Sequence, residues 1–314
     1  MKKCIYFLAA LLVLAGCDGL DYVSGGNNGN SGGVTPSTGS ETVDGVAQPK
    51  GAIKHILDVQ TDNRERHLFD FDDVYIYDAD GRMVTDKCTQ KTYNGESGTL
   101  SRTDNYEYTH HYYDGNRYEY WNTPKSSSKT QEGTLNAKGQ LATLNRMSLS
   151  GTLLRTDSFT YDADGHLTKF VRDMAGGNKT TFTYTWVNGN MTASVETVTS
   201  GSSTLSTKQR NYSYSREVNP TRGHFLDLQY RCCFPEADLS MMLGTGPVNT
   251  VTMVYIVSSK ANLGLVERLF NYEWNSGHTQ IAKMERTVLS FPCEEEQILL
   301  KERTIDTYTV EYYK

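Results

Sequence analysis

Short turn sequences of one kind recur along this chain at nearly regular spacing. The stretch YDADGRM at residues 77–83 returns as YDADGHL at residues 161–167, and LNAKGQL at residues 135–141 follows the same pattern. Glycines in comparable settings are Gly81, Gly115, Gly139, Gly165 and Gly189. From Gly115 onward the intervals are 24, 26 and 24 residues, which suits two strands of about ten residues and two turns. The repeat therefore predicts consecutive hairpins.

The segments between these turns alternate like strands. In TFTYTW, residues 181–186, every second residue is aromatic. A period of two, rich in Thr, Tyr, Phe and Val, is typical of β-strands, and no stretch of three turns carries the apolar stripe of a helix. We predict an all-β fold, an antiparallel meander of about 16 to 18 strands that forms a barrel-like or strongly curved sheet. We expect the repeat-poor residues 217–314 to complete the same sheet.

The paired aspartates of these turns raise the question of a metal site. Asp78 and Asp80, like Asp162 and Asp164, resemble the beginning of a calcium loop, but the third acid and the distal glutamate are missing. In LNAKGQL the second acid is replaced by Lys138, which would repel a cation. Because Asp-Gly and Asn-Gly pairs tolerate positive φ, we interpret these acids and glycines as turn residues, and we predict no metal and no cofactor.

The N-terminus has the parts of a secretory signal. Lys2 and Lys3 precede an apolar core at residues 4–14, which is too short to span a bilayer as a helix. The following LAGC resembles the bacterial lipobox, and that resemblance implies cleavage before Cys17 and acylation of this cysteine, with palmitate among the attached chains. The alternative is an ordinary signal peptide with an incidental cysteine. The expected arrangement is a signal peptide at residues 1–16 and a lipid anchor on the outer membrane that does not span it.

The domain organisation follows from composition. Residues 17–50 are rich in Gly, Asn, Ser and Thr and offer little to bury, so we expect the acylated cysteine to lead into a flexible tether. Residues 51–314 are expected to form a single β-hairpin-repeat domain. No later segment approaches about 18 consecutive apolar residues. The mean hydropathy is −0.55, and most strand faces carry Thr, Lys, Asp or Arg, which favours a barrel in water over a pore.

The charge balance excludes some partners. The formal net charge is −6, and loss of Lys2 and Lys3 leaves 29 basic against 37 acidic residues, or −8. Because no basic patch is present, we predict no nucleic-acid partner. The mature chain has four cysteines besides Cys17, and their spacing is not that of a zinc site. They are Cys88, Cys232, Cys233 and Cys293. Disulfides between Cys88 or Cys293 and one of the adjacent pair, and buried free thiols, are both compatible with export.

The aromatic run NYEYTHHYYDGNRYEYW, residues 105–121, is the strongest candidate for a ligand site. Alternation places Tyr106, Tyr108, His110 and Tyr112 on one face of a strand, with Tyr118 and Tyr120 on one face of the next strand and Trp121 opposite. Facing outward, these rings could form a platform for a glycan or a protein. Facing inward, they would be the core of a Tyr-rich sheet. Adjacent His110 and His111 face opposite ways and suit a structural role better than a metal site.

Acidic residues offer a second functional hypothesis. The cluster Asp70, Asp72 and Asp73 and the run 294–296 could supply the paired carboxylates of a glycan-acting hydrolase. We favour the interpretation that they are edge charges that block association between sheets. No nucleophile elbow, zinc-protease motif, P-loop or dinucleotide-binding motif occurs. We therefore expect a non-enzymatic binding or structural protein of the envelope and keep the hydrolase as the alternative.

A family resemblance rests on these features together. The YDxxGxL hairpins resemble the tyrosine-aspartate repeats of large secreted shell proteins. A lipobox, a Gly/Ser tether and hairpins with Y-D-A-D-G-R/H-L/M are similar to an uncharacterised lipoprotein family of gut commensals, a domain of unknown function with a porin-like fold. The resemblance covers most of residues 51–314, although the repeats degenerate after about residue 216. It implies a barrel-like or strongly curved antiparallel sheet and provides no catalytic residues.

Overall fold

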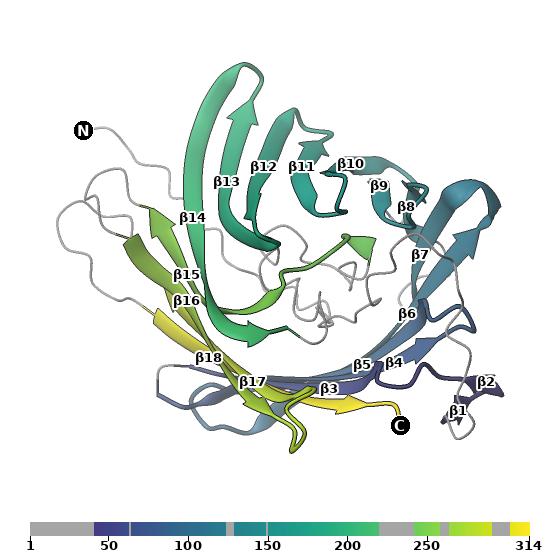
Figure 1. Cartoon of the computed structure of the whole chain (residues 1–314), viewed down its shortest axis with the longest axis vertical. Coiled ribbons are helices and arrows are strands. Elements are labelled where there is room, and N and C mark those ends of the chain that lie inside the picture. Colours follow the sequence, from purple (N-terminus) through teal and green to yellow (C-terminus); the bar gives the residue numbers. More distant parts are fainter. Residues whose placement is uncertain are drawn as a thin grey trace.

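The fold is a closed β-barrel. The computed structural model describes residues 41–62, 64–123, 129–148, 150–219, 242–257, 264–290 and 302–314. In it, sixteen strands, β3 to β18, form the barrel (Figure 1). Their bounds are β3 Ile53–Thr61, β4 His67–Tyr77, β5 Met83–Tyr93, β6 Leu100–Tyr113, β7 Arg117–Thr123, β8 Lys129–Leu135, β9 Leu141–Met147, β10 Leu153–Tyr161, β11 Leu167–Met174, β12 Asn178–Val187, β13 Asn190–Ser200, β14 Ser203–Val218, β15 Asn249–Val257, β16 Gly264–Trp274, β17 Ile281–Ser290 and β18 Glu302–Tyr312. The predicted all-β meander is confirmed.

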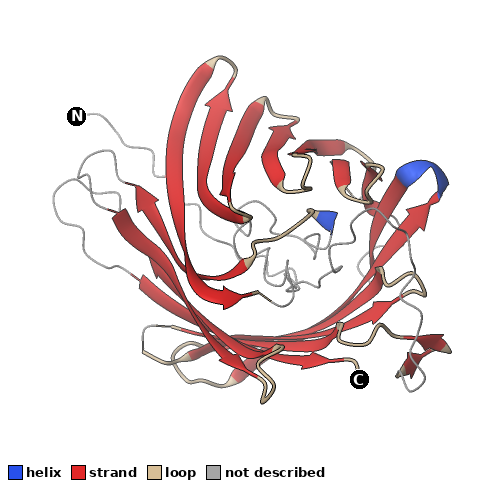
Figure 2. Ribbon diagram, in the orientation of Figure 1, coloured by secondary structure: helices blue, strands red, loops and turns tan. Residues whose placement is uncertain are grey.

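Every strand pairs antiparallel with its neighbours in the sequence, and β18 pairs antiparallel with β3 to close the barrel. The repeat-poor strands β15 to β18 belong to this same sheet, as expected. The short 3-10 turn η1 (Asp114–Asn116) connects β6 to β7, and among the described residues Met242 also has 3-10 conformation (Figure 2). No helix among them is long and apolar enough to cross a membrane.

The recurring turns all lie at one end of the barrel. They connect β4 to β5, β6 to β7, β8 to β9, β10 to β11 and β12 to β13. A period of two strands in an up-and-down barrel returns the chain to the same end, so the sequence repeat and the geometric repeat coincide. We call this the turn end and the opposite one the far end.

The D-A-D-G turn has the geometry that its sequence predicts. The Gly81 amide donates to the Asp78 carbonyl at 3.0 Å, and Gly81 has φ +77°. The Asp78 carboxylate accepts from the amides of Asp80 and Arg82, both at 2.9 Å. The equivalent Asn136 accepts from the amides two and four residues ahead. The first Asx residue therefore shapes the turn, which explains why Lys138 can replace the second acid.

The turn NSGHTQ at residues 275–280, between β16 and β17, resembles these turns but differs in detail. There the left-handed position belongs to His278, with φ +53°, and Gly277 is not among the residues with positive φ. The His278 amide donates to the Asn275 carbonyl at 2.9 Å. The left-handed residue is thus again the third after the capping Asx, but the glycine comes one residue before it. The turn is also one residue longer, because the Asn275 amide donates to the Gln280 carbonyl, whereas the Asp78 amide donates to the Arg82 carbonyl.

A ring of identical side-chain contacts explains the aromatic residue of the repeat. Near the end of seven of the eight even-numbered barrel strands, a Tyr or Trp donates to a backbone carbonyl near the beginning of the preceding strand. The pairs are Tyr77–Ile53, Tyr112–Met83, Tyr161–Leu141, Trp186–Leu167, Tyr214–Met191, Tyr272–Val251 and Tyr312–Ile281, at 2.8–3.0 Å. In β8 the corresponding Leu135 has no polar side-chain atom to donate. Each bond joins two strands that are connected by a loop at the far end. It therefore holds these two strands together at the turn end.

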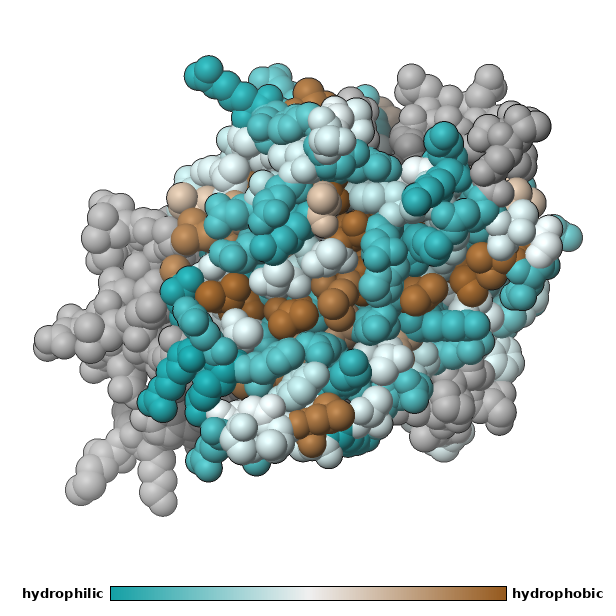
Figure 3. Space-filling model, turned by 90° about the horizontal axis from the view of Figure 1, so that it is seen from below, coloured by the Kyte–Doolittle hydropathy of each residue, from teal (hydrophilic) through white to brown (hydrophobic). Residues whose placement is uncertain are grey.

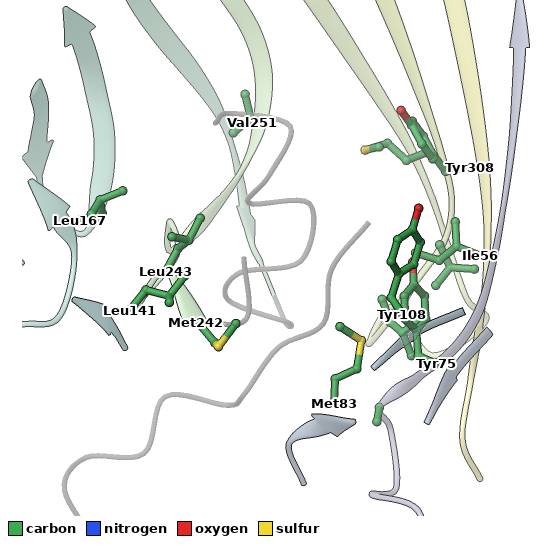
Figure 4. Packing of buried hydrophobic residues seen from close by; sticks show 14 of the residues in the cluster. Ile56, Tyr75, Met83, Tyr108, Leu141, Leu167, Met242, Leu243, Val251 and Tyr308 are labelled. Carbon is green, nitrogen blue, oxygen red and sulfur yellow. The ribbon is translucent and has the colours of Figure 1, made fainter. Parts of the chain in front are cut away.

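The inner wall of the barrel is packed as a core. Side chains from opposite walls point into the interior, as Figure 4 shows for Tyr75 and Tyr308 on one side and Leu141 and Leu167 on the other. Their exposed fractions are 0–1%. A barrel of sixteen strands is wide enough for an aqueous channel, but the burial of these residues shows an interior that is filled at their level.

The outer face is largely hydrophilic. On β12 the outward Thr183 and Thr185 are exposed, and on β6 so are Asn105 and Glu107. On the face that Figure 3 shows, hydrophilic residues predominate and hydrophobic ones gather in a narrow, interrupted band. Outer-membrane barrels present an unbroken apolar band to lipid, and the interrupted band on this face differs from that arrangement.

A strap at residues 242–248 lies across the turn end. The Thr245 amide donates to the Gly165 carbonyl at 2.9 Å, and the Val248 amide donates to the Gly189 carbonyl at 3.0 Å. A Cβ on Gly244, whose φ is +91°, would lie 2.2 Å from the Gly165 carbonyl oxygen. The carbonyls of Gly165 and Gly189, in two of the repeat turns, therefore bind this segment. Its first residue, Met242, is buried in the interior (Figure 4).

A small hairpin of β1 (Thr42–Val43) and β2 (Val46–Ala47) precedes the barrel. It lies within residues 17–50, the segment that the sequence predicts to be tether. The Gln48 amide nitrogen donates to the Tyr77 carbonyl and its oxygen accepts the Tyr77 amide, at 3.1 and 2.9 Å. These bonds fix the hairpin to the turn end of β4.

The cysteine question is settled in part. Cys88 lies on the inner face of β5, is 2% exposed and is disulfide-bonded. The free-thiol alternative therefore does not hold for Cys88. The predictions for Cys232, Cys233 and Cys293, like those for Cys17 and the signal, fall outside the described residues.

Candidate functional site

The aromatic run divides between the two faces of the β6–β7 hairpin. Five of the six predicted platform residues point inward and are buried or nearly so. They are Tyr106, Tyr108, Tyr112, Tyr118 and Tyr120. Trp121, the sixth, alternates with them and lies on the outer face. The five tyrosines therefore belong to the core of the sheet, whereas Trp121 lies on the outer face.

The inward rings form a continuous stack. Tyr108 stacks on Tyr106 at 6.2 Å and on Tyr120 at 5.4 Å between ring centroids. His110 meets Tyr120 edge to face at 5.3 Å, and its Nδ1 lies 2.8 Å from the Tyr118 hydroxyl. The contacts that Tyr108 and His110 on β6 make with Tyr118 and Tyr120 on β7 are cross-strand pairs, and each such pair stabilises the sheet by about 0.2–1 kcal/mol. These residues hold the wall together.

Two buried titratable groups on this inner wall have strongly shifted pKa values. Burial raises the pKa of the Asp86 carboxyl to about 8, and neither of its oxygens has a hydrogen-bond partner in the described structure. Burial, with a smaller effect of His111, lowers the pKa of His110 to about 3. Both groups are therefore mostly uncharged at neutral pH, which suits their apolar surroundings.

Arginines meet one buried aspartate on the opposite part of the wall. Asp157 on β10 is fully buried and receives the Arg172 guanidinium, with Nε at 3.1 Å and Nη2 at 3.3 Å from its two oxygens. The Arg155 Nε lies 3.2 Å away. Burial and the charge of Arg172 lower the pKa of Arg155 to about 9. The arrangement is a desolvated ion-pair network inside the barrel.

A second group of residues surrounds Trp121 on the outer face, and we call it the outer cluster. It consists of His111, Tyr113, Arg117, Glu119 and Trp121. Register places His111 opposite Glu119 and Tyr113 opposite Arg117 across the two strands. The exposed aromatic site is thus formed by the odd-numbered residues of this hairpin, which alternate with the inward tyrosines.

Glu119 organises the outer cluster. Its carboxylate accepts from the Tyr113 hydroxyl at 3.0 Å, the Arg117 Nη1 at 2.9 Å and the Trp121 Nε1 at 3.3 Å. Only 5% of Glu119 is exposed. Three donors converge on one acid, so the rings are held in place before any ligand arrives.

The rings of the outer cluster contact one another while part of their surface stays in solvent. His111 stacks on Tyr113 at 6.2 Å and meets Trp121 edge to face at 5.7 Å. The Arg117 guanidinium lies 3.9 Å from the Tyr113 ring centroid. Tyr113 is 39% exposed and the Arg117 side chain 54%. Of this group, the predicted ligand platform includes only Trp121, and the sequence favours a structural role for His111. Strict alternation from Trp121 would have placed all five residues on one face.

The turn acids come close together without forming a separate site. In the part of the chain that the structure describes, potential ligand atoms of Asp162, Asp164 and His166 lie within 4.8 Å of one another. The Asp162 carboxylate, however, accepts from the His166 amide at 2.9 Å and lies 3.1 Å from the His166 Nδ1. His166 also stacks on Trp186 at 4.3 Å. These contacts are those of the turn itself.

The acids proposed for a hydrolase do not share one cleft. Asp73 is buried on the inner face, whereas Asp70 and Asp72 alternate with it. Asp70 contacts His67 and accepts from the Tyr93 hydroxyl at 2.7 Å, and Asp72 lies 2.8 Å from a His55 ring nitrogen. Because the barrel is closed, β4 has neighbours on both sides, so the interpretation of these acids as edge charges is wrong. The run 294–296 lies outside the described residues.

One shallow cavity of about 380 Å³ lies between two of the repeat turns. Lys138, Thr160 and Asp162 contribute polar atoms to it. The Lys138 Nζ donates to the Ala163 carbonyl at 2.8 Å, so a residue that lines the cavity also joins the two turns.

Comparison with known proteins identifies the fold. No family model matches the sequence, and no curated protein matches it significantly. Among solved structures, a porin-like protein from Bacteroides uniformis is similar, with a TM-score of 0.58 and 16% identity over 82% of this chain and 98% of the other. A porin-like protein from Bacteroides vulgatus has a TM-score of 0.45 and 11% identity over 83% and 98%. The porin-like fold implied by the family resemblance is confirmed by the first of these.

Proposed function

We propose that this chain is a non-enzymatic binding protein of the cell envelope, anchored by lipid to the outer membrane. The observation that carries the proposal is the outer cluster. It combines preorganised aromatic rings and an exposed guanidinium on an otherwise hydrophilic barrel surface. Side chains of these types dominate binding sites because they offer a large contact area at low entropic cost.

The interior supports a scaffold role for the barrel. Aromatic side chains and ion pairs such as Arg172–Asp157 extend from the inner face of the wall into the interior. A filled barrel holds the β6–β7 hairpin rigid and leaves binding to its outside. The ligand is a glycan or an envelope protein, in line with the expectation from the sequence.

The N-terminal arrangement supports display at a membrane. The β1–β2 hairpin is bound to the turn end through Gln48, so the tether reaches the barrel there. The 23 residues between Cys17 and Glu41 would have a root-mean-square reach of about 25 Å as a flexible coil. The outer cluster would then be presented at a distance from the lipid surface.

Replacing Cys17 tests the anchor. In cells that make the full-length chain, Cys17→Ala is expected to abolish incorporation of labelled palmitate and to move the protein out of the membrane fraction. Cys88→Ala tests whether any cysteine loss has this effect, and we expect it to keep the label. Palmitate labelling of the Cys17→Ala protein equal to that of the wild type would contradict the proposed anchoring.

A further inference from the structure

We infer that the outer cluster is a carbohydrate-binding site that takes a neutral pyranose ring. This inference rests on the proposed binding function and names the chemical class of its ligand. Aromatic rings with both faces apolar suit the CH-rich faces of sugars, and nearby hydrogen-bonding groups suit the sugar hydroxyls.

The cluster has hydrogen-bonding capacity left over. Among the described residues, no hydrogen bond uses the ring nitrogens of His111, and Arg117 gives Glu119 the one hydrogen bond described for its five guanidinium N–H groups. Both residues flank the rings that a sugar would contact. Hydroxyl groups could therefore bond to His111 and Arg117 while the carbon face of the sugar contacts Trp121.

The charge of the cluster favours a neutral ligand. The Arg117 guanidinium is 2.9 Å from the Glu119 carboxylate, and the two charges cancel locally. An acidic sugar would have to compete with Glu119 for Arg117. A cationic ligand would meet the same guanidinium, which is more exposed than the acid.

The size of the cluster favours a sugar over a protein. A stable protein interface covers about 800 Å² on each partner and involves about 20–30 residues a side. The outer cluster has five residues, and the outward positions next to it are polar or charged. They are Thr109 on β6 and Glu132 and Thr134 on β8. Such a small aromatic group in polar surroundings matches one or two sugar rings.

Affinity electrophoresis of the full-length protein in detergent tests the site. Gels would contain soluble starch, barley β-glucan, galactomannan or, as an acidic comparison, polygalacturonate. We expect retardation by at least one neutral polysaccharide, and a loss of affinity of at least tenfold in Trp121→Ala. His111→Ala, which leaves the Glu119 hydrogen bonds in place, is expected to weaken binding severalfold. Tyr255→Ala, on the outer face of β15, provides the matched control and should bind like the wild type.

The outcomes separate the two proposals. No retardation by any neutral polysaccharide, or equal retardation of the wild type and both cluster variants, would overturn the carbohydrate site. Preferential binding of polygalacturonate would overturn the assignment to neutral sugars. Cross-linking of an envelope protein that depends on Trp121, without polysaccharide binding, would overturn the sugar site but uphold a binding protein. Palmitate labelling of Cys17 is independent of all these results, so failure of the anchor is recognised separately.

Discussion

Asp157→Ala is expected to lower the free energy of unfolding by about 3–5 kcal/mol, because it removes the carboxylate from a buried ion pair and leaves the guanidinium desolvated. Asp157 is fully buried, and Arg172 bonds to both of its oxygens. Urea denaturation followed by circular dichroism measures the effect.

The matched control is Asp173→Ala on the next strand. The Asp173 carboxylate lies 2.9 Å from Lys179, but both side chains are about half exposed. We expect a change within about 0.5 kcal/mol for this pair, because exposed ion pairs contribute little. Equal costs for the two variants would show that the inner face of β10 is hydrated, against the filled interior described above.

The free energy of unfolding of the wild type is expected to fall between pH 6.5 and 8, and Asp86→Asn is expected to abolish this fall. The pKa of Asp86 rises from 3.8 to about 8 on folding, so the folded state holds a proton that the unfolded state releases. Stability from this group is therefore present at low pH and is lost as pH rises toward 8. At about 1.36 kcal/mol per pH unit, the loss over this window is roughly 2 kcal/mol.

His110 limits the window in which the effect of Asp86 is visible. Its pKa falls from 6.5 to about 3 on folding, so its contribution is lost as pH falls below 6.5. Between about pH 4 and 6.5 the two slopes oppose each other, and only above 6.5 does Asp86 act alone. Urea midpoints at pH 6.5 and 8 for the wild type, Asp86→Asn and the exposed control Asp80→Asn measure this. Identical pH profiles for the wild type and Asp86→Asn would contradict a buried neutral carboxyl.

Much of the fold could be predicted because the repeat is short and local. The turn spacing predicts the hairpins, and Asp78 and Gly81 predict the turn geometry from residue chemistry alone. The contacts between strands were less accessible. The bond from Tyr161 to the Leu141 carbonyl joins residues 20 positions apart, and no local signal shows whether a Tyr hydroxyl meets a carbonyl or water.

Only part of the candidate site could be predicted from the sequence. Alternation correctly separates Trp121 from Tyr120, but it does not show which face points into the barrel. That choice depends on closure of the sheet between β18 and β3, which joins residues about 250 positions apart. The role of Glu119 depends on three side chains meeting in space, and a lone glutamate in an alternating strand looks like any solvent-exposed charge.

Hydroxyl-radical footprinting of the folded protein, read by mass spectrometry, tests the central claim most directly. The claim is that the β6–β7 hairpin has a core face and a surface face. We expect Trp121 and Tyr113 to be oxidised rapidly, and Tyr108 and Tyr120 to be protected until denaturant is added, because the latter two are only 4% and 3% exposed. Oxidation of Tyr108 and Tyr120 in the folded protein at the rate of Trp121 would contradict the claim.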